Sequence, residues 1–305
     1  MPTQKRDCAA QGTSTRAIFQ RRLRVAFVLA VLLVLGLARA ALAQVSGLDN
    51  DLELVDPKVL RVCADPQNLP FSNEKGEGFE NKLAELLARK LDKKLAYTWY
   101  PQSVGFVRNT LSAHRCDVIP GFPMGDDLVQ STNPYYRTGY ALVFKGGGGF
   151  DDLDTLVDPR LKTKRIGIVA GTPPATYLAL NGLLQQTKSY PLIVDTRVES
   201  SSLNMMNDVA SGVIDIAILW GPMAGYYARQ ANPPMRVAVL AKEIGGPHLS
   251  YRIAMGVRPS DQNWKRVLNR ILSQNRAEID HLLIDFGVPL LDDNDRPITD
   301  DVRPK

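Results

Sequence analysis

Residues 61–80 read RVCADPQNLPFSNEKGEGFE, and this stretch decides the class of fold. It begins inside a short apolar run that predicts a buried strand over residues 58–64. A loop of polar and aromatic residues follows, and Gly78-Phe79-Glu80 then opens a stretch with helical periodicity. The apolar positions of that stretch are Phe79, Leu83, Leu86, Leu87 and Leu91. A strand, a loop and an amphipathic helix in this order form the repeating unit of α/β proteins with largely parallel sheets.

The same alternation continues outward from this unit to the end of the chain. We predict strands over residues 96–100, 142–144, 166–169 and 251–257, and helices over residues 105–113, 264–272 and 279–286. Residues 114–120 turn from a helix into a strand, and residues 211–218 repeat this pattern about a hundred residues later. Two lobes with a similar order of strands and helices would explain the repeat. Chance similarity between two ordinary turns is the alternative.

The strands that leave and return define the two predicted lobes. The strand over 142–144 leaves the first lobe. The glycines at 146–149 after it give the backbone conformational freedom at low steric cost. The strand over 251–257 crosses back, so the C-terminal helices complete the first lobe. We predict a first lobe of residues 44–142 plus 252–305 and a second lobe of residues 143–251. The acidic tail over residues 292–305 is expected to be loosely ordered.

The first 43 residues have the pattern of a secretory signal peptide. Four arginines between residues 16 and 24 precede an uncharged run over residues 25–38, and Ala41-Leu42-Ala43 matches the small-x-small site that signal peptidase cuts. As a helix the run reaches about 21 Å, short of the ~30 Å hydrocarbon core, so a retained anchor helix is the weaker alternative. We predict a periplasmic protein with no membrane anchor after cleavage.

The formal charge of +5 belongs to this export segment. Residues 1–43 carry seven basic groups and one acidic group, so their removal leaves a net charge of −1. The positive excess that attracts nucleic acids is then absent, and we predict no nucleic-acid partner.

Two cysteines follow the export segment, Cys63 and Cys116. The periplasm oxidises thiols, which favours a disulfide between them. Two unpaired buried cysteines are the alternative. A mature chain of this length buries a hydrophobic core large enough to fold without covalent cross-links, so its folding does not require the disulfide.

Common catalytic motifs are missing from the chain. It has no G-x-S-x-G nucleophile elbow, no P-loop and no G-x-G-x-x-G dinucleotide motif. Its three histidines, at positions 114, 248 and 281, have no second ligand at metal-binding spacing, and we expect them on the surface or at a hinge. We therefore predict no enzymatic activity, no metal and no cofactor.

The deciding stretch, together with Asn133-Pro134-Tyr135-Tyr136 and Ala170-Gly171-Thr172, resembles the bilobed periplasmic solute-binding proteins of ABC importers. The resemblance covers residues 60–290. It implies a type II periplasmic binding protein fold, with two α/β lobes joined by two crossing strands and a cleft between them. It also implies that the strand carrying Cys63 neighbours the one that begins near Cys116, which would allow the bridge.

A narrower resemblance rests on residues 61–80 together with Pro101-Gln102 and the run from Gly105 to Leu111. These residues resemble the MxaJ/XoxJ-type accessory proteins associated with quinoprotein methanol dehydrogenases. Such proteins are encoded with a PQQ-dependent alcohol dehydrogenase and its cytochrome c. The resemblance implies these two proteins as partners and a role in maturing or activating the dehydrogenase.

Amino-acid binding is disfavoured by two positions. In amino-acid receptors of this fold an arginine binds the α-carboxylate and an aspartate binds the α-ammonium. The corresponding positions here are Gly125 and Trp220. A zwitterion entering this cleft would lose its water without gaining charged partners, which costs several kcal/mol.

The predicted cleft is lined by apolar and aromatic side chains with a few polar groups, and it suits a protein segment or an apolar ligand. Its residues are Asp65, Asn68, Phe71, Phe106, Tyr135, Tyr136, Thr172 and Trp220. Ordinary packing beneath the loops is the alternative for the aromatic members. We favour an accessory factor for a dehydrogenase over an importer receptor for a small solute other than an amino acid. A lyase-like enzyme, with Asp65 or Glu77 as the acid or base, is the third interpretation.

Overall fold

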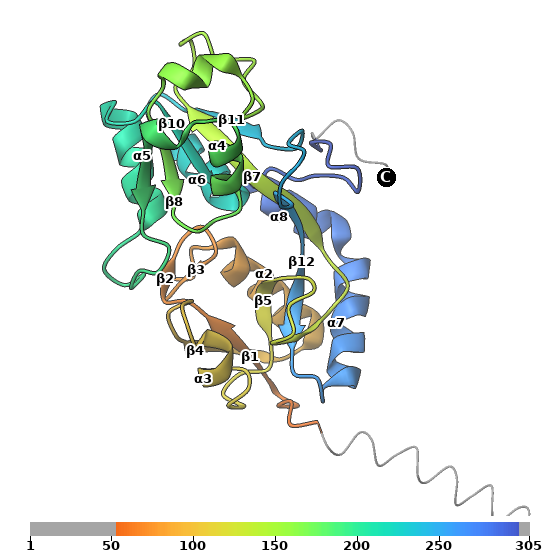
Figure 1. The fold of residues 1–305 in the computed structure, drawn as a ribbon. Helices are drawn as coiled ribbons and strands as arrows, with labels where there is room; N and C mark the ends of the chain where they lie inside the picture. The colour runs from red at the N-terminus through yellow and green to blue at the C-terminus, as the bar shows by residue number, and fades with distance from the viewer. Residues whose placement is uncertain (1–52, 299–305) are drawn as a thin grey trace, which may run out of the picture. The chain divides into compact units, whose positions relative to one another are not determined.

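The computed structural model describes residues 53–298, and the predicted signal peptide lies outside them, as do residues 299–305. Figure 1 shows the elements in chain order. The first half contains β1 (Val59–Ala64), β2 (Gln67–Asn68), β3 (Ser72–Asn73), α2 (Phe79–Leu91), β4 (Lys94–Trp99), α3 (Phe106–Asn109), β5 (Ile119–Pro123), β6 (Gln130–Ser131), β7 (Tyr136–Phe144), a 3-10 turn (Pro159–Thr163) and β8 (Ile166–Val169). The second half contains α4 (Pro174–Leu180), a 3-10 turn (Leu184–Gln186), β9 (Thr187–Tyr190), α5 (Ser201–Ser211), β10 (Ile216–Trp220), α6 (Gly221–Gln230), β11 (Arg236–Val239), β12 (Ser250–Val257), α7 (Gln262–Gln274) and α8 (Arg276–Asp285).

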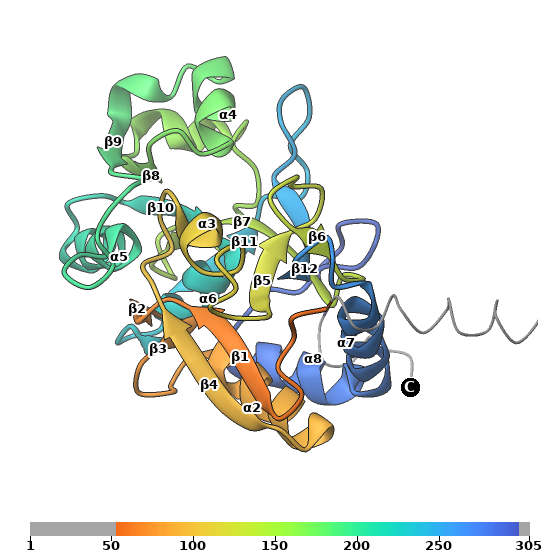
Figure 2. The same cartoon turned by 90° about the horizontal axis from the view of Figure 1, so that it is seen from below.

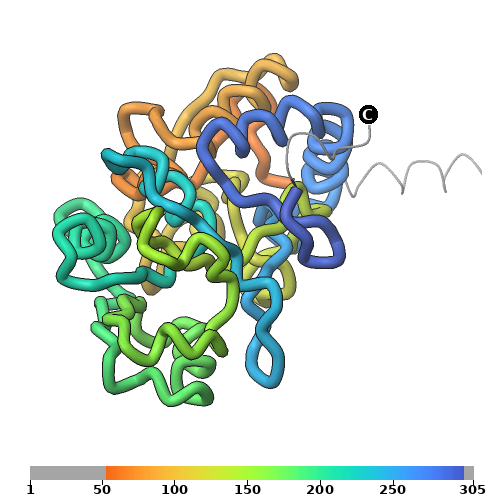
Figure 3. Tube along the Cα trace, turned by 90° about the horizontal axis from the view of Figure 1, so that it is seen from above, coloured from red at the N-terminus to blue at the C-terminus, as the bar shows by residue number. Residues whose placement is uncertain are grey.

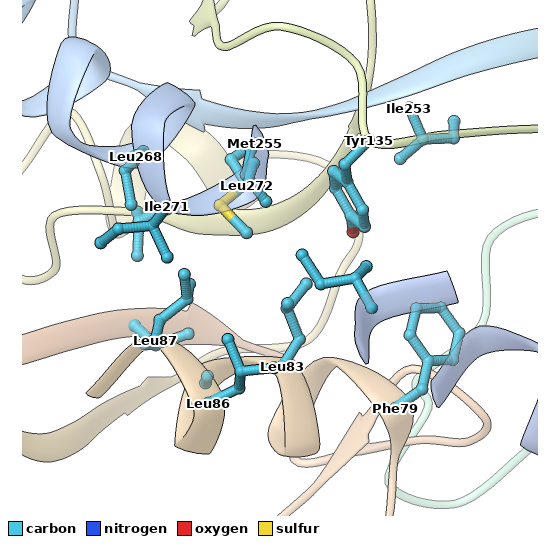
Figure 4. Packing of buried hydrophobic residues seen from close by; sticks show 14 of the residues in the cluster. Phe79, Leu83, Leu86, Leu87, Tyr135, Ile253, Met255, Leu268, Ile271 and Leu272 are labelled. Carbon is cyan, nitrogen blue, oxygen red and sulfur yellow. The ribbon is translucent and has the colours of Figure 1, made fainter. Parts of the chain in front are cut away.

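The unit that begins the first lobe folds as its periodicity predicts. Strand β1 pairs in parallel with β4, which lies beside it in Figure 2, and α2 connects the two. The side chain of Asn81 accepts hydrogen bonds from the backbone of Asn73 and Gly78 and so closes the first turn of α2. The apolar face of α2 packs against the C-terminal helices, because burying that face removes it from water. Figure 4 shows residues that meet there: Leu83, Leu86 and Leu87 from α2, Leu268, Ile271 and Leu272 from α7, and Met255 from β12.

Strands β7 and β12 cross between the lobes. Residues 136–139 of β7 pair with β12, whereas residues 140–144 pair with β10, and residues 141–144 also pair with β11. Beyond the crossing, the sheet of the second lobe continues from β10 to β8 and β9. The mixed α/β, bilobed architecture confirms the predicted fold class. The exact lobe boundaries at 142/143 and 251/252 stay predictions.

Strand β7 begins six residues earlier than the predicted strand over 142–144. Its first part includes Arg137, Thr138 and Gly139, which lack an apolar run, and pairing with β12 holds these residues extended. The predicted helix over 105–113 is also shorter, because α3 ends at Asn109 and turns follow. Near the end of α3, the hydroxyl of Thr110 donates to the carbonyl oxygen of Phe106 at 2.6 Å.

The expectation of a loosely ordered tail is wrong for residues 292–298. Asp295 accepts two hydrogen bonds from the guanidinium group of Arg137, at 2.6 and 2.8 Å. Asp292 is paired with Arg296, and Leu291 forms a strand bridge with Pro297. The acidic residues are therefore held by arginine partners. None of the helices in residues 53–298 is long and apolar enough to cross a membrane.

The loop between β11 and β12 projects from the second lobe, as Figures 2 and 3 show. Its base is held by the carboxylate of Glu243, which accepts hydrogen bonds from Thr155 and the backbone of Leu156. The hydroxyl of Tyr177 donates to the carbonyl oxygen of Pro247 at 2.9 Å. Ile244 lies in this loop with most of its side chain exposed. His248 in the same loop is exposed, as are His114 and His281.

Candidate functional site

A cavity of about 850 Å³ is bounded by loops of both lobes. The loops after β1 and β4 contribute residues 67–69 and 102–104, and the segment between β9 and α5, with the first residues of α5, contributes most of residues 191–203. Most of the lining is apolar or aromatic, and among the described residues Glu199 is the one lining residue with a charged side chain. A cavity of this composition suits an uncharged, largely apolar occupant.

Three of the eight predicted cleft residues line the cavity, namely Asn68, Thr172 and Trp220. Asp65 lies at its edge, 2% exposed, and holds loops together. Its carboxylate accepts hydrogen bonds from the backbone N–H groups of Gln67 at 2.8 Å and Gln102 at 2.6 Å. A carboxylate placed in this way organises the rim of the cavity.

The other four predicted cleft residues are aromatic and pack away from the cavity. Phe106 lies in a small core with Cys63 and Cys116, and Phe71 packs on Phe79 with ring centroids 5.3 Å apart. Tyr135 and Tyr136 are buried in the core beneath α2. The hydroxyl of Tyr135 donates to the carbonyl oxygen of Pro120 at 2.9 Å, so its one polar group is satisfied there. Aromatic rings at the base of the loops complete the first lobe's core because each ring removes a large apolar area from water.

Tyrosines that the sequence reasoning missed supply the aromatic wall instead. Tyr140 and Trp220 lie edge to face with ring centroids 5.3 Å apart, and Tyr226 and Tyr227 follow on α6. Burial raises the pKa of Tyr140 to about 12, so its hydroxyl stays a neutral hydrogen-bond donor. The alternation Tyr136, Thr138, Tyr140 along β7 was a local signal that could have identified this strand as extended.

The segment over residues 191–200, here called the strap, was also missed because it has no regular periodicity. Leu192, Ile193 and Val198 lie on it with exposed side chains. The hydroxyl of Thr196 donates to both oxygens of Asp65, at 2.9 and 3.0 Å. A second contact between the lobes is the hydrogen bond from the hydroxyl of Tyr227 to the carbonyl oxygen of Leu69, at 3.2 Å. Neutral donors therefore link the two lobes through Thr196 and Tyr227, both of which line the cavity.

Glu80, at the start of α2, has a buried carboxyl group that is 6% exposed. Within residues 53–298 no side chain forms an ion pair or hydrogen bond with this carboxyl group. Burial, and to a smaller extent the negative charge of Asp65, raises the pKa of Glu80 to about 8. Its Oε1 lies 2.2 Å from the position that a Cβ atom on Gly121 would occupy, so a larger residue at position 121 would require the Glu80 carboxyl group to move.

Neither acid proposed for a lyase-like enzyme is placed for proton transfer in the cavity. Asp65 already accepts hydrogen bonds from two backbone groups and from Thr196. Glu77 is exposed outside the cavity lining and accepts a hydrogen bond from the side chain of Asn73 at 2.7 Å. The geometry offers no support for the enzymatic interpretation.

Cys63 and Cys116 form a disulfide with Cα atoms 5.4 Å apart. Strand β1 and residues 116–118 lie side by side, because the backbone N–H of Cys63 donates to the carbonyl oxygen of Val118 at 2.9 Å. Asp117, next to this bridge, is fully buried. Its carboxylate binds Arg61 through two hydrogen bonds, at 2.6 and 2.7 Å, and Arg258 through one at 2.7 Å. Arg258 also pairs with the buried Asp261 at 2.7 Å.

No family model matches the chain. A curated relative, the protein MoxJ of Paracoccus denitrificans, is 30% identical over 273 residues, which are 85% of this chain and 96% of the relative. The crystal structure of the periplasmic binding protein XoxJ from Methylobacterium extorquens AM1 is 43% identical, with a TM-score of 0.67, covering 77% of this chain and all of that one. MxaJ from Methlophaga aminisulfidivorans MPT is 30% identical, with a TM-score of 0.65, covering 76% of this chain and all of that one. An ancestral cationic amino acid solute-binding protein, 21% identical with a TM-score of 0.59, shares the fold.

Proposed function

This chain belongs to the MxaJ/XoxJ-type family of periplasmic binding proteins, and from that premise we propose that it is a periplasmic accessory factor for a dehydrogenase. Its partner is a quinoprotein, PQQ-dependent methanol or alcohol dehydrogenase, with the cytochrome c of that enzyme as a second partner. The chain binds the dehydrogenase and assists its maturation or activation. The motifs shared with accessory proteins of this kind support the choice of partner.

The observation that carries this proposal is the exposed apolar rim of the cavity. Val104 on one side is 78% exposed, and on the strap Ile193 is 66% and Val198 is 84% exposed. Apolar side chains that gather around one opening mark sites where proteins bind other proteins. Because Glu199 is the one charged side chain among the described lining residues, the affinity of this rim for a partner would come mainly from apolar burial.

The polar groups of the cavity support a partner other than an amino acid. Gly125 is exposed, lies outside the cavity lining and offers no side chain to a carboxylate. Trp220 forms part of the wall where amino-acid receptors carry an aspartate. An amino acid would find one acidic side chain, Glu199, and no basic side chain among the described lining residues.

The volume of the cavity favours a second candidate function. A value of about 850 Å³ falls in the range of pockets that hold small organic ligands. This supports a receptor of an ABC importer for a small solute other than an amino acid as the alternative.

A capture experiment tests the accessory role. The chain beginning at Gln44 is immobilised, and binding of the purified dehydrogenase, and separately of its cytochrome c, is measured by surface plasmon resonance. We expect the double substitution Ile193→Asp and Val198→Asp to weaken dehydrogenase binding by at least about tenfold, because each carboxylate would have to be desolvated in an apolar interface.

The matched control is Ile244→Asp, which places the same charge on an exposed isoleucine outside the cavity lining. It should leave dehydrogenase binding unchanged. If the unsubstituted chain captures neither protein, the accessory role fails and a thermal-shift screen of small solutes becomes the test of the receptor alternative.

A further inference from the structure

We infer that the strap, residues 191–200, is a gate over the cavity and that the contact between Thr196 and Asp65 is the latch that holds it shut. This inference rests on the proposed function, because the gate would control access to the surface where the partner docks. The structure then represents the latched state.

The strap is anchored at both ends within its own lobe. At one end, the carbonyl oxygen of Tyr190 accepts a hydrogen bond from the backbone N–H of Ala170 at 2.9 Å. At the other, the hydroxyl of Ser201 donates to the carbonyl oxygen of Pro191 at 2.6 Å. These contacts survive when the middle of the strap moves, so the anchors are suited to be the two ends of a hinge.

The tip of the strap is a local turn that can move as one piece. The backbone N–H groups of Val198 and Glu199 both donate to the carbonyl oxygen of Asp195, at 3.0 Å. Arg197 and Asp195 form an ion pair at 2.7 Å on the same turn. None of these contacts involves the first lobe, so opening the gate leaves them intact.

Little apolar burial opposes the opening. Leu192, Ile193 and Val198 are exposed while the gate is shut, so moving them exposes little further apolar surface. Within residues 53–298, the hydrogen bonds of Thr196 to Asp65 tie the tip to the first lobe. The crossing contact of Tyr227 with Leu69 comes from α6 and not from the tip of the strap.

Asp65 is suited to release and recapture the tip. Its carboxylate keeps the hydrogen bonds from the backbone of Gln67 and Gln102 when Thr196 leaves, so its position is maintained in the open state. Thr196 is neutral, and the latch therefore needs no change of charge to open. Docking of a partner on the apolar rim would supply the free energy that moves the strap.

The test measures how quickly a reagent reaches the cavity wall behind the strap. Ser202 is buried, lines the cavity and contacts the sulfur of Met223, so Ser202→Cys places a thiol there. The chain beginning at Gln44 with the Cys63–Cys116 bridge formed has no other free thiol. Alkylation by iodoacetamide is followed by intact mass in three backgrounds: Thr196, Thr196→Val and Thr196→Ser.

We expect Thr196→Val to raise the alkylation rate by about tenfold, because valine keeps the shape of threonine and loses its hydrogen bond to a carboxylate. Thr196→Ser keeps the hydroxyl and should react at the parent rate. A thiol from Ser273→Cys, exposed on α7, serves as the reagent control and should react equally in all three backgrounds.

A rate for Thr196→Val within twofold of the parent would overturn the latch, as would an equal acceleration by Thr196→Ser. The assay contains no dehydrogenase, so its outcome is independent of the capture experiment. If alkylation responds as expected while capture fails, the gate stands and the proposed partner falls.

Discussion

Replacing Glu80 with glutamine is expected to make the protein keep its stability as the pH rises to about 8. The unsubstituted protein loses stability over the same rise. The pKa of Glu80 is raised from 4.5 to about 8 in the folded protein, by burial first and by the charge of Asp65 second. Between these two values the unfolded chain releases the proton that the folded protein retains. The stabilising contribution is therefore complete below pH 4.5 and is lost as the pH rises toward 8.

The size of this effect follows from the shift. A difference of this magnitude corresponds to at most about 5 kcal/mol of unfolding free energy, because each pKa unit is worth about 1.4 kcal/mol. Glutamine matches the shape of the neutral acid and has no proton to lose. We expect Glu80→Gln to match the unsubstituted protein near pH 4.5 and to be several kcal/mol more stable at pH 8.

Urea unfolding at pH 4.5, 6 and 8 measures the expected difference. Tyr135 and Tyr136 also interact with the Glu80 charge, but burial raises the pKa of both hydroxyls well above its usual value, so they stay neutral over this range. The control is Glu74→Gln, an exposed carboxyl group in the loop before α2, which should keep the pH dependence. Parallel pH profiles for Glu80→Gln and the unsubstituted protein would contradict the assignment.

Replacing Arg258 with methionine is expected to destabilise the protein by about 3–5 kcal/mol, because it leaves a buried carboxylate without a cation. Arg258 contacts both Asp117 and Asp261, and both aspartates are fully buried. Asp117 keeps its pair of hydrogen bonds from Arg61, whereas Asp261 has no second cation among residues 53–298. The larger part of the loss is therefore expected at Asp261.

A second substitution separates the charge effect from lost packing. Adding Asp261→Asn to Arg258→Met removes the uncompensated charge and should recover a substantial part of the stability. Arg270→Met, on the exposed face of α7, is the matched control and should change the urea midpoint little. The charge explanation fails if the double variant is no more stable than Arg258→Met alone.

Local sequence patterns predicted much of the fold. The strand over 166–169 coincides with β8, and the helix that begins at Phe79 coincides with α2. Both patterns lie within one contiguous segment, where the spacing of apolar residues sets which face is buried. Strand β7 was predicted only in part, because its first residues are held extended by a strand more than a hundred residues later.

The candidate site was less predictable than the fold. Trp220, Asn68 and Thr172 were identified, because they occupy positions that motifs place at the ends of strands. Phe106, Tyr135 and Tyr136 occupy similar positions along the chain and point into the core instead. Whether a loop aromatic faces a cavity or a core depends on what packs against it, and that partner is distant in sequence.

The sequence by itself determined the α/β class, the order of strands and helices in the first lobe, and the family. Each of these depends on residues that are neighbours along the chain or recur at fixed spacing. Only the tertiary structure decided which tyrosines line the cavity, that the Glu80 carboxyl group is buried with no side-chain partner among residues 53–298, and that Thr196 meets Asp65. Thr196 and Asp65 are 131 residues apart, and neither has a local pattern that indicates the other. Such contacts form only when the two lobes bring their loops together, because a hydrogen bond depends on distance in space rather than along the chain.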